Sequence, residues 1–391
     1  MNYLSDFFLK SKIINIFLFG LLVRIIVLIF HGFSNFSDTE TYKLIGEEIF
    51  NLQKVTTSIH MPGYGIYIYL NNFLLNSEYG FYFIDILLSS ITIILIYRVS
   101  KKIFNDELVA KISAFIFALY PFSVFYSISG LNETLYVFLL LLVILNFYNK
   151  KYLLATIFLV LSIYVKSISF YIGPVLFLTF LFIQKKLNLK NFFYFSFIYL
   201  SVLVILMTPW WVHNYKKFNS FVPTDLGFGY HLYAGNNVMN KTGGGIGGQD
   251  VDHSIILDLN KFGEHDYLKS DKIFKQEAYN FIVQNPSNFL DLSIKKLLKF
   301  WRIYPYTKEY KSFFYKIISI FSYGLILVFF FIFLFFYSKK FLFSVFPLVI
   351  TILLFTFIYT LTISSIRYRF PIEPLLIILA SYPIKRLLFK R

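Results

Sequence analysis

The sequence predicts an all-helical protein that crosses a membrane about ten times. Hydrophobic residues make up 57% of the chain, which holds 51 Phe and has a mean hydropathy of +0.65. Apolar runs of about 17–25 residues recur along the chain, and such runs are typical of helices that cross a bilayer. The short alternating segments expected of a β-barrel are absent. We therefore expect a polytopic α-helical membrane protein.

Ten apolar runs are interpreted as crossings. They cover residues 13–31, 81–97, 112–129, 131–148, 153–165, 168–183, 192–209, 313–337, 341–362 and 371–388. The first run has no small-residue cleavage site after it, so we interpret it as a retained helix and not as a signal peptide.

Basic residues set the expected orientation. The loops on one side of the ten runs hold 17 of the 37 Lys and Arg residues, and they alternate without a break. By the positive-inside rule these loops and both termini are cytoplasmic. The net charge of +16 is then explained by topology and anionic lipid headgroups, so nucleic acid is not a predicted partner. A composition rich in Asn, Lys, Ile and Phe suggests a bacterial source, and hence the cytoplasmic membrane.

Two loops on the outer side are long. In the first, residues 32–80, apolar residues recur at helical spacing beside charged ones, which predicts amphipathic helices on the membrane surface. The second, residues 210–312, holds 13 basic and 10 acidic residues, and we expect it to form a few helices that cap the membrane part. We divide the chain into an N-terminal membrane module (1–209), an outer loop region (210–312) and C-terminal membrane helices (313–391).

Asp38 is the candidate catalytic residue. It directly follows the first predicted crossing, where an ionised carboxylate is costly and usually retained for a function. Such a carboxylate can act as a general base if it lies beside the reacting hydroxyl and accepts its proton. The simpler interpretation is that Asp38 caps the following helix. Glu40 is a candidate second carboxylate, or a partner of the helix dipole.

Cations at the outer ends of predicted helices are candidates for binding a phosphate group. They are Lys166, His213, Arg367 and Arg369. The two arginines could instead extend to lipid headgroups, and Arg24, within the first crossing, could form an internal ion pair.

Metal and nucleotide sites are not indicated. The chain has no Cys, and the Gly-rich segment 240–249 lacks the Gly-Lys-Ser/Thr of a nucleotide loop. The outer-loop residues His253, His265, Asp250, Asp252 and Asp266 have no diagnostic spacing, so a solvated loop is favoured over a metal site. No cofactor is required, although a divalent metal is compatible with the sequence.

Three motifs occur in order along this topology. Asp38 and Tyr42 follow the first crossing, and Pro-Gly-Tyr stands at 62–64. Thr-Pro-Trp-Trp-Val-His-Asn-Tyr at 208–215 leads to Leu-Tyr-Ala-Gly-Asn-Asn at 232–237, and Arg-Tyr-Arg-Phe-Pro-Ile-Glu-Pro at 367–374 opens the last helix. Together they resemble the GT-C glycosyltransferases, specifically the bacterial relatives of dolichyl-phosphate-mannose protein mannosyltransferases and of aminoarabinose transferases.

The resemblance implies a transferase that acts on the outer face of the membrane. It would move a sugar, with inversion, from a polyprenyl-phosphate donor to a hydroxyl of a glycan, lipid or protein acceptor. The resemblance implies that Asp38 is the base and that the donor phosphate is held by the cations above. The groove residues implied are Tyr42, His60, Tyr64, Tyr233 and Asn236.

Two departures from the family pattern affect this interpretation. Thr39 separates two acids that are usually adjacent, which leaves the role of Glu40 open, and His213 replaces a common Arg. Alternatives are a transporter or flippase of lipid-linked sugars, a polysaccharide polymerase or ligase, and a non-catalytic membrane assembly protein. A transporter would be expected to carry charges along a path through the helices and to show paired halves.

Overall fold

The computed structural model describes residues 10–52, 55, 58–183, 189–244, 267–305 and 312–389. Every regular element in these ranges is helical, as predicted. The first half contains α2 (Ile13–His31), α3 (Ser37–Phe50), α4 (Gly63–Leu74), α5 (Gly80–Phe104), α6 (Glu107–Leu119), α7 (Pro121–Tyr126), α8 (Glu133–Tyr148), α9 (Tyr152–Val165) and α10 (Ile168–Ile183). The second half contains α11 (Leu189–Phe218), α12 (Phe228–Gly235), α14 (Tyr267–Gln284), α15 (Pro286–Phe300), α16 (Phe313–Ser319), α17 (Leu325–Phe336), α18 (Leu342–Leu361), α19 (Ile366–Arg369) and α20 (Glu373–Leu388).

Helices occur at all ten predicted crossings. Five segments of the described chain are long and apolar enough to span a membrane by length and composition, namely Ile13–His31, Gly80–Phe104, Leu189–Phe218, Phe313–Phe336 and Ser338–Leu361. The shorter apolar helices are α8, α9 and α10. A helical membrane protein is therefore confirmed at this coarser level, while the number of ten crossings stays a prediction.

The predicted crossing at residues 112–129 is wrong as a single helix. Tyr120 is extended, and the chain breaks there into α6 and α7. The cause is Pro121, which disfavours helical backbone at the residue before it and suits the first position of a new helix. The break allows the Tyr120 side chain to enter the core, where it is 2% exposed.

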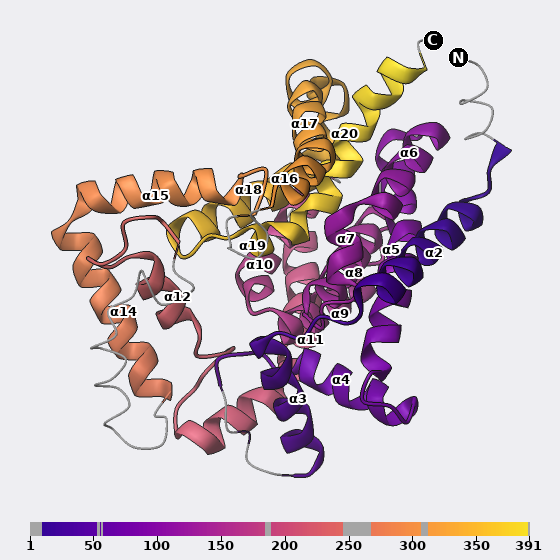
Figure 1. The fold of residues 1–391 in the computed structure, drawn as a ribbon. Helices are drawn as coiled ribbons and strands as arrows, with labels where there is room; N and C mark the ends of the chain where they lie inside the picture. Colours follow the sequence, from indigo (N-terminus) through magenta and orange to yellow (C-terminus); the bar gives the residue numbers. More distant parts are fainter. Residues whose placement is uncertain are drawn as a thin grey trace.

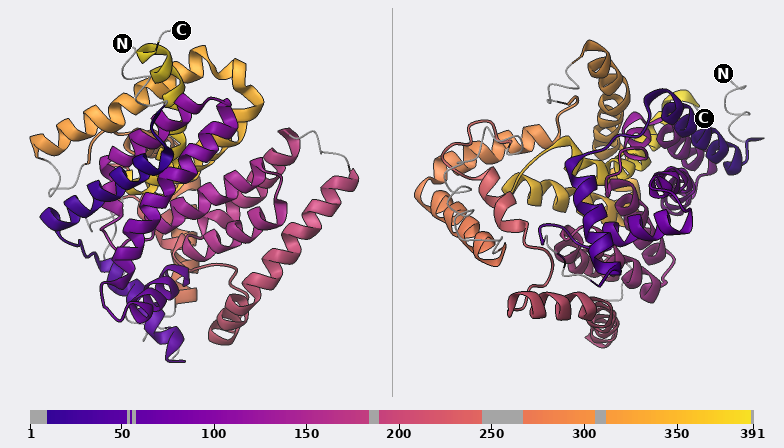
Figure 2. Two further views of the ribbon diagram at one scale, coloured as in Figure 1. Left: turned by 90° about the vertical axis from the view of Figure 1, so that its right-hand side faces the viewer. Right: turned by 60° about the horizontal axis from the view of Figure 1, so that its bottom comes forward.

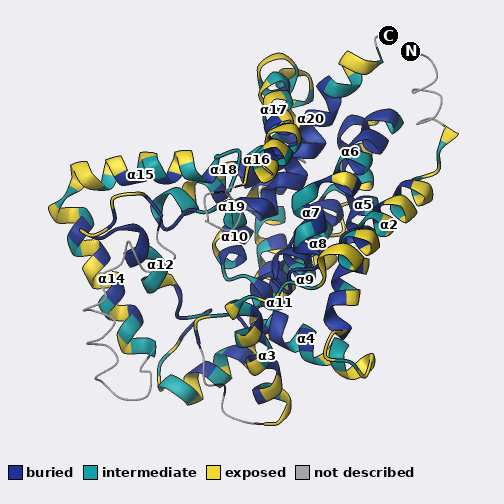
Figure 3. Ribbon diagram, in the orientation of Figure 1, coloured by how far each residue is buried: buried dark blue, intermediate teal, exposed yellow. Residues whose placement is uncertain are grey.

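The core lies between α5, α6, α8, α9, α10, α18 and α20. In Figure 1, α8 and α9 lie near the centre, and α20 runs along the upper part of the bundle. Figure 3 shows α20 mostly buried, whereas α2 carries many exposed residues. The long α11 runs along the outside of the bundle (Figure 2) and packs mainly on α9. The start of α2 and the end of α20 lie at one end of the bundle, and α3 and α4 lie towards the other (Figure 1).

Arg24 lies within α2 and is fully buried. Its guanidinium donates to the hydroxyls of Ser89 and Ser123 and to the carbonyls of Gly20 and Ala118. The predicted internal ion pair is therefore wrong. Neutral oxygens from α2, α5 and the α6–α7 break satisfy this cation, so Arg24 joins helices by hydrogen bonds.

The first long loop forms α3 and α4, which confirms the two helices predicted there. The pair crosses closely because both helices carry glycine at the contact. A Cβ atom on Gly46 would lie 2.3 Å from the carbonyl oxygen of Gly65. Tyr42 and Tyr64 then pack into one aromatic cluster beneath the crossing. This cluster fixes the start of α3, where Asp38 lies.

The second long loop forms α12, α14 and α15, which lie to the left of the bundle in Figure 1. Lys296 on α15 is fully buried and donates to Asn236 Oδ1 and to the carbonyls of Leu361 and Thr362. It thereby ties α15 to the ends of α12 and α18. The few capping helices predicted for this loop region are therefore present as α12, α14 and α15. The acids and histidines at 250–266 lie outside the described residues.

Candidate active site

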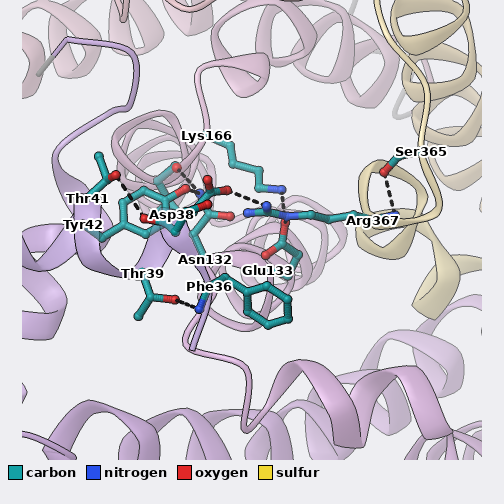
Figure 4. Close-up of polar contacts among 12 residues, drawn as sticks. Phe36, Asp38, Thr39, Thr41, Tyr42, Asn132, Glu133, Lys166, Ser365 and Arg367 are labelled. Atoms are coloured by element: carbon teal, nitrogen blue, oxygen red, sulfur yellow. Dashed lines mark hydrogen bonds and ion pairs between the residues drawn. The ribbon is translucent and has the colours of Figure 1, made fainter. Parts of the chain in front are cut away.

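Asp38 lies in the first turn of α3. The backbone of Phe36 is extended, and its N–H donates to the Thr39 hydroxyl at 3.2 Å. Thr39 therefore serves this end of the helix, and Asp38, which was considered as the cap, is left for another role. The Asp38 side chain is 31% exposed, and its Oδ2 lies 2.5 Å from a terminal nitrogen of Arg367. The candidate base thus faces a cation from the far end of the chain (Figure 4).

Arg367 joins two carboxylates. It lies in the short helix α19, whose start is capped by the Ser365 hydroxyl. Its Nε donates to Glu133 Oε1 at 2.7 Å while its terminal nitrogen contacts Asp38. A guanidinium has five N–H donors, and those of Arg367 beyond these two contacts have no partner among the described residues. The side chain is 28% exposed, so these donors are available to a ligand.

Glu133 and Lys166 complete the group. Glu133 begins α8 and is fully buried, and Lys166 follows α9 in extended backbone with its Nζ 2.8 Å from Glu133 Oε1. Asp38, Glu133, Lys166 and Arg367, which we call the Arg367 cluster, therefore pair two carboxylates with two cations. Figure 4 shows the four side chains converging from α3, α8, α19 and the α9–α10 junction. The cluster balances its own charge before any ligand binds.

Burial and the neighbouring carboxylates have opposite effects on the pKa values of the two cations. Burial lowers the pKa of Lys166, and the Glu133 carboxylate acts in the opposite direction. Burial also opposes the charge of Arg367, but Glu133, Tyr42 and Asp38 overcome it and hold its pKa well above the ordinary value. A fixed positive charge therefore remains beside the two carboxylates.

Glu133 was not identified from the sequence. It lies inside the apolar run at 131–148, which was interpreted as a crossing without regard to its acid. An acid at the outer end of a predicted membrane helix is the same signal that identified Asp38. Glu133 takes the place of the second carboxylate that was sought at Glu40.

Glu40 points away from the cluster. It is 58% exposed, pairs with Lys43 at 3.1 Å and accepts a hydrogen bond from Asn35. The Asn35 and Lys43 side chains lower its pKa. The prediction of Glu40 as a second carboxylate is therefore not supported by its position, which follows from its place on the outward face of α3.

Tyr42 and Tyr64 lie beneath the cluster. Both are almost completely buried. The Tyr42 hydroxyl accepts a hydrogen bond from Asn132, the neighbour of Glu133, and the Tyr64 hydroxyl donates to Asp85 at 2.7 Å. They hold α3 against α4, α5 and α8, so they support the site and do not line an open groove.

His60 lies beside Tyr42, with ring centroids 4.8 Å apart, and is half-buried. It borders the cluster, and its role in a groove stays a prediction. His213 does not border the cluster. Its ring stacks on Trp210 in α11 at 5.1 Å, and no described contact joins it to the cluster. The structure therefore brings His60 to the site and leaves His213 outside it.

Tyr233 and Asn236, predicted as groove residues, are buried in the outer loop region. Tyr233 packs against Phe274 of α14, and Asn236 binds Lys296 and the carbonyls of Leu232 and Leu361. Their position does not fit a groove, because Tyr233 packs on α14 and the Asn236 amide joins α12 to α15 and α18.

Arg369, predicted as a phosphate ligand, has no exposed surface. Its Nε lies 2.6 Å from Glu373 Oε1, and its guanidinium carbon lies 3.5 Å from the centre of the Tyr323 ring. Tyr120 donates to the other oxygen of Glu373 at 2.7 Å. We call these four residues the Arg369 cluster. The prediction for Arg369 is wrong because its charge is matched inside the core.

Part of the chain matches a known protein family. Residues 62–213 match the family model described as dolichyl-phosphate-mannose-protein mannosyltransferase. No curated protein matches the chain. The segment contains Glu133 and Lys166, while Asp38 and Arg367 lie outside it.

The fold is similar to that of an oligosaccharyltransferase from Archaeoglobus fulgidus. The apo crystal structure gives a TM-score of 0.59 at 14% identity, covering 97% of this chain and 51% of that one. The enzyme, named AglB, in complex with an inhibitory peptide and a dolichol-phosphate gives 0.58 at 13% identity, covering 98% and 52%. This chain spans about half the length of those proteins, and the similarity concerns the fold.

The comparisons confirm the resemblance predicted from the sequence. The class of enzyme predicted with it, a glycosyltransferase that uses a lipid-phosphate sugar donor, stays a prediction, which the family match over residues 62–213 favours.

Proposed function

From the family match of residues 62–213, we propose that this protein is an integral-membrane inverting glycosyltransferase. It moves a sugar from a polyprenyl-phosphate donor to a hydroxyl of a glycan, lipid or protein acceptor. We further propose ten crossings, with both termini in the cytoplasm of a bacterial cell and the site on the outer face of its cytoplasmic membrane. The membrane modules 1–209 and 313–391 together supply the cluster, and 210–312 covers it.

The observation that carries the proposal is the arrangement of the Arg367 cluster. A partly exposed carboxylate, Asp38, lies against a partly exposed guanidinium whose remaining donors are free for a ligand. Lys166 lies within the same ion-pair network. A base beside an anion-binding pair is the arrangement needed to break a bond between a sugar and a phosphate.

The chemistry follows from these positions. Arg367 and Lys166 hold the donor phosphodiester, which carries one negative charge. Asp38 takes the proton of the acceptor hydroxyl, and the hydroxyl oxygen forms a bond to the anomeric carbon on the side opposite the phosphate. The bond between that carbon and the phosphate oxygen breaks, and the configuration inverts. The departing polyprenyl phosphate carries a charge of about −1.5 to −2, so both cations stabilise it more strongly than the bound donor.

A metal ion fits this cluster poorly. One related structure is the Archaeoglobus fulgidus enzyme in complex with Zn and sulfate. In this chain, each carboxylate of the cluster already faces a cation. Among the described residues no group of three His, Asp or Glu side chains could hold a metal. We therefore derive no step through a metal.

Transfer from defined donors tests the proposal. Membranes containing the wild type or Asp38→Asn would be supplied with a panel of synthetic polyprenyl-phosphate sugars and an acceptor extract, and labelled products would be measured. We expect Asp38→Asn to bind donor but to transfer about 10²–10⁴ times more slowly. Glu47→Gln, an exposed carboxylate on the same helix, is the matched control and should transfer normally. Normal transfer by Asp38→Asn would exclude Asp38 as the base.

A further inference from the structure

Two histidines from different parts of the chain border the Arg367 cluster. His60 precedes α4, and His231 lies in α12. The charges of Asp38, Arg367 and Lys166 act on both rings, and the His60 ring also acts on His231. Both side chains are half-buried, so each retains access from outside the protein. The two imidazoles therefore lie around the same site as the candidate base.

Neither imidazole has a hydrogen-bond partner among the described residues. Aromatic rings surround them instead. The ring centroids of Tyr42 and His60 are 4.8 Å apart. The ring centroids of Tyr230 and Tyr368 lie 6.1 Å and 6.3 Å from that of His231. A polar ring that is largely removed from water loses free energy unless another group bonds to it. The missing partner is best supplied by a molecule that enters the site.

The charge of the surroundings indicates which part of a ligand the histidines contact. Burial lowers the pKa of each to about 4, so both rings are neutral at physiological pH. A neutral imidazole offers one donor and one acceptor, which suits uncharged hydroxyls. The phosphate has a better partner in Lys166 and Arg367. The sugar is bonded directly to that phosphate, so it must lie beside these cations and near Asp38.

We propose that His60 and His231 form the subsite that binds the hydroxyls of the transferred sugar, with Tyr42, Tyr230 and Tyr368 around it. This inference rests on the proposed function. It assigns sugar recognition to two neutral rings and phosphate recognition to the two cations, so the two halves of the donor are read by different side chains.

Binding of two ligands separates these roles. Purified protein would be titrated with bare polyprenyl phosphate and with the polyprenyl-phosphate sugar that the wild type transfers. We expect His60→Phe and His231→Phe each to weaken binding of the glycosylated donor about 10–100-fold, the effect of leaving a hydroxyl unpaired. Binding of bare polyprenyl phosphate should stay within about twofold, and each His→Gln variant should recover part of the loss. His31→Phe, at an exposed position, is the control.

Deoxy donors provide the second measurement. Removing the hydroxyl that a histidine contacts should weaken binding to the wild type and have little further effect in the matching Phe variant. Equal losses for both ligands, or unchanged binding of the glycosylated donor, would overturn the subsite. If the wild type transferred no lipid-linked sugar and Arg367→Gln left polyprenyl phosphate binding unchanged, the proposed function itself would fail, and this inference with it.

Discussion

Two arginines that are two residues apart have opposite environments in this protein. Arg367 is 28% exposed and bridges Asp38 and Glu133, whereas Arg369 is completely buried against Glu373. On a helical turn, positions i and i+2 point in nearly opposite directions. One side chain of the short α19 therefore reaches the site, and the other enters the core.

The difference teaches how an identical residue type serves binding in one cluster and packing in the other. The Arg367 cluster contains two carboxylates and two cations, so its charges balance. It still leaves N–H donors of Arg367 free, so an anion can bind to it. In the Arg369 cluster, the guanidinium bonds to Glu373 and to the carbonyls of Phe300 and Arg302 and lies over the ring of Tyr323. Exposure thus distinguishes the binding arginine from the structural one, because the free donors of Arg367 can be reached by a ligand and Arg369 has no exposed surface.

The largest expected effect is on stability, at the Arg369 cluster. Arg369→Gln leaves the Glu373 carboxylate buried without its cation, and breaking such a pair typically costs about 3–5 kcal/mol of unfolding free energy. Thermal unfolding in detergent would measure it. The double variant Arg369→Gln/Glu373→Gln should recover part of the loss, because no unpaired charge remains. Unchanged stability of the single variant would show that the pair does not hold this end of the fold.

The next effect concerns catalysis at the Arg367 cluster. Glu133→Gln removes the carboxylate that orients both cations, so we expect the transfer rate to fall about 10²-fold through misplacement of Arg367. Donor binding should be unchanged or tighter, because one negative charge has left the site. Rates and affinities measured separately would show this split. Weaker donor binding at a normal maximal rate would contradict the orienting role.

A smaller effect is expected when the pH is lowered, because two histidines beside the Arg367 cluster then become protonated. His60 and His231 have pKa values of about 4 in the folded protein, below the ordinary 6.5. Between these values the unfolded chain binds more protons than the folded chain, so lowering the pH from 6.5 to 4 destabilises the folded state. Thermal unfolding between pH 7 and pH 4.5 checks this. The double variant His60→Gln/His231→Gln should lose part of the dependence, and an identical pH profile would count against the neutral rings.

The smallest effect is expected at Glu40. Its carboxylate is 58% exposed and pairs with Lys43 on the surface of α3. Exposed pairs of this kind contribute about 0–1 kcal/mol, so Glu40→Gln should change transfer less than twofold and stability little. A large loss of transfer would place Glu40 in the site and remove the contrast with Glu133.

The sequence predicted the helices and the position of Asp38 because both depend on local patterns. Apolar runs and an acid after a membrane helix are visible in short windows. The separation of Arg367 from Arg369 was not predictable in this way. The partner of Arg369 is four residues away, a spacing that suggests a helical pair. The partners of Arg367 are 329 and 234 residues away and required the folded structure.

The most direct test of this account is binding of polyprenyl phosphate to the wild type, Arg367→Gln and Arg369→Gln, each checked by thermal unfolding. Arg367→Gln should lose at least tenfold in affinity while keeping most of its stability. Arg369→Gln should lose stability, and its remaining folded fraction should bind normally. Normal affinity in folded Arg367→Gln would contradict the central claim that the Arg367 cluster binds the donor phosphate.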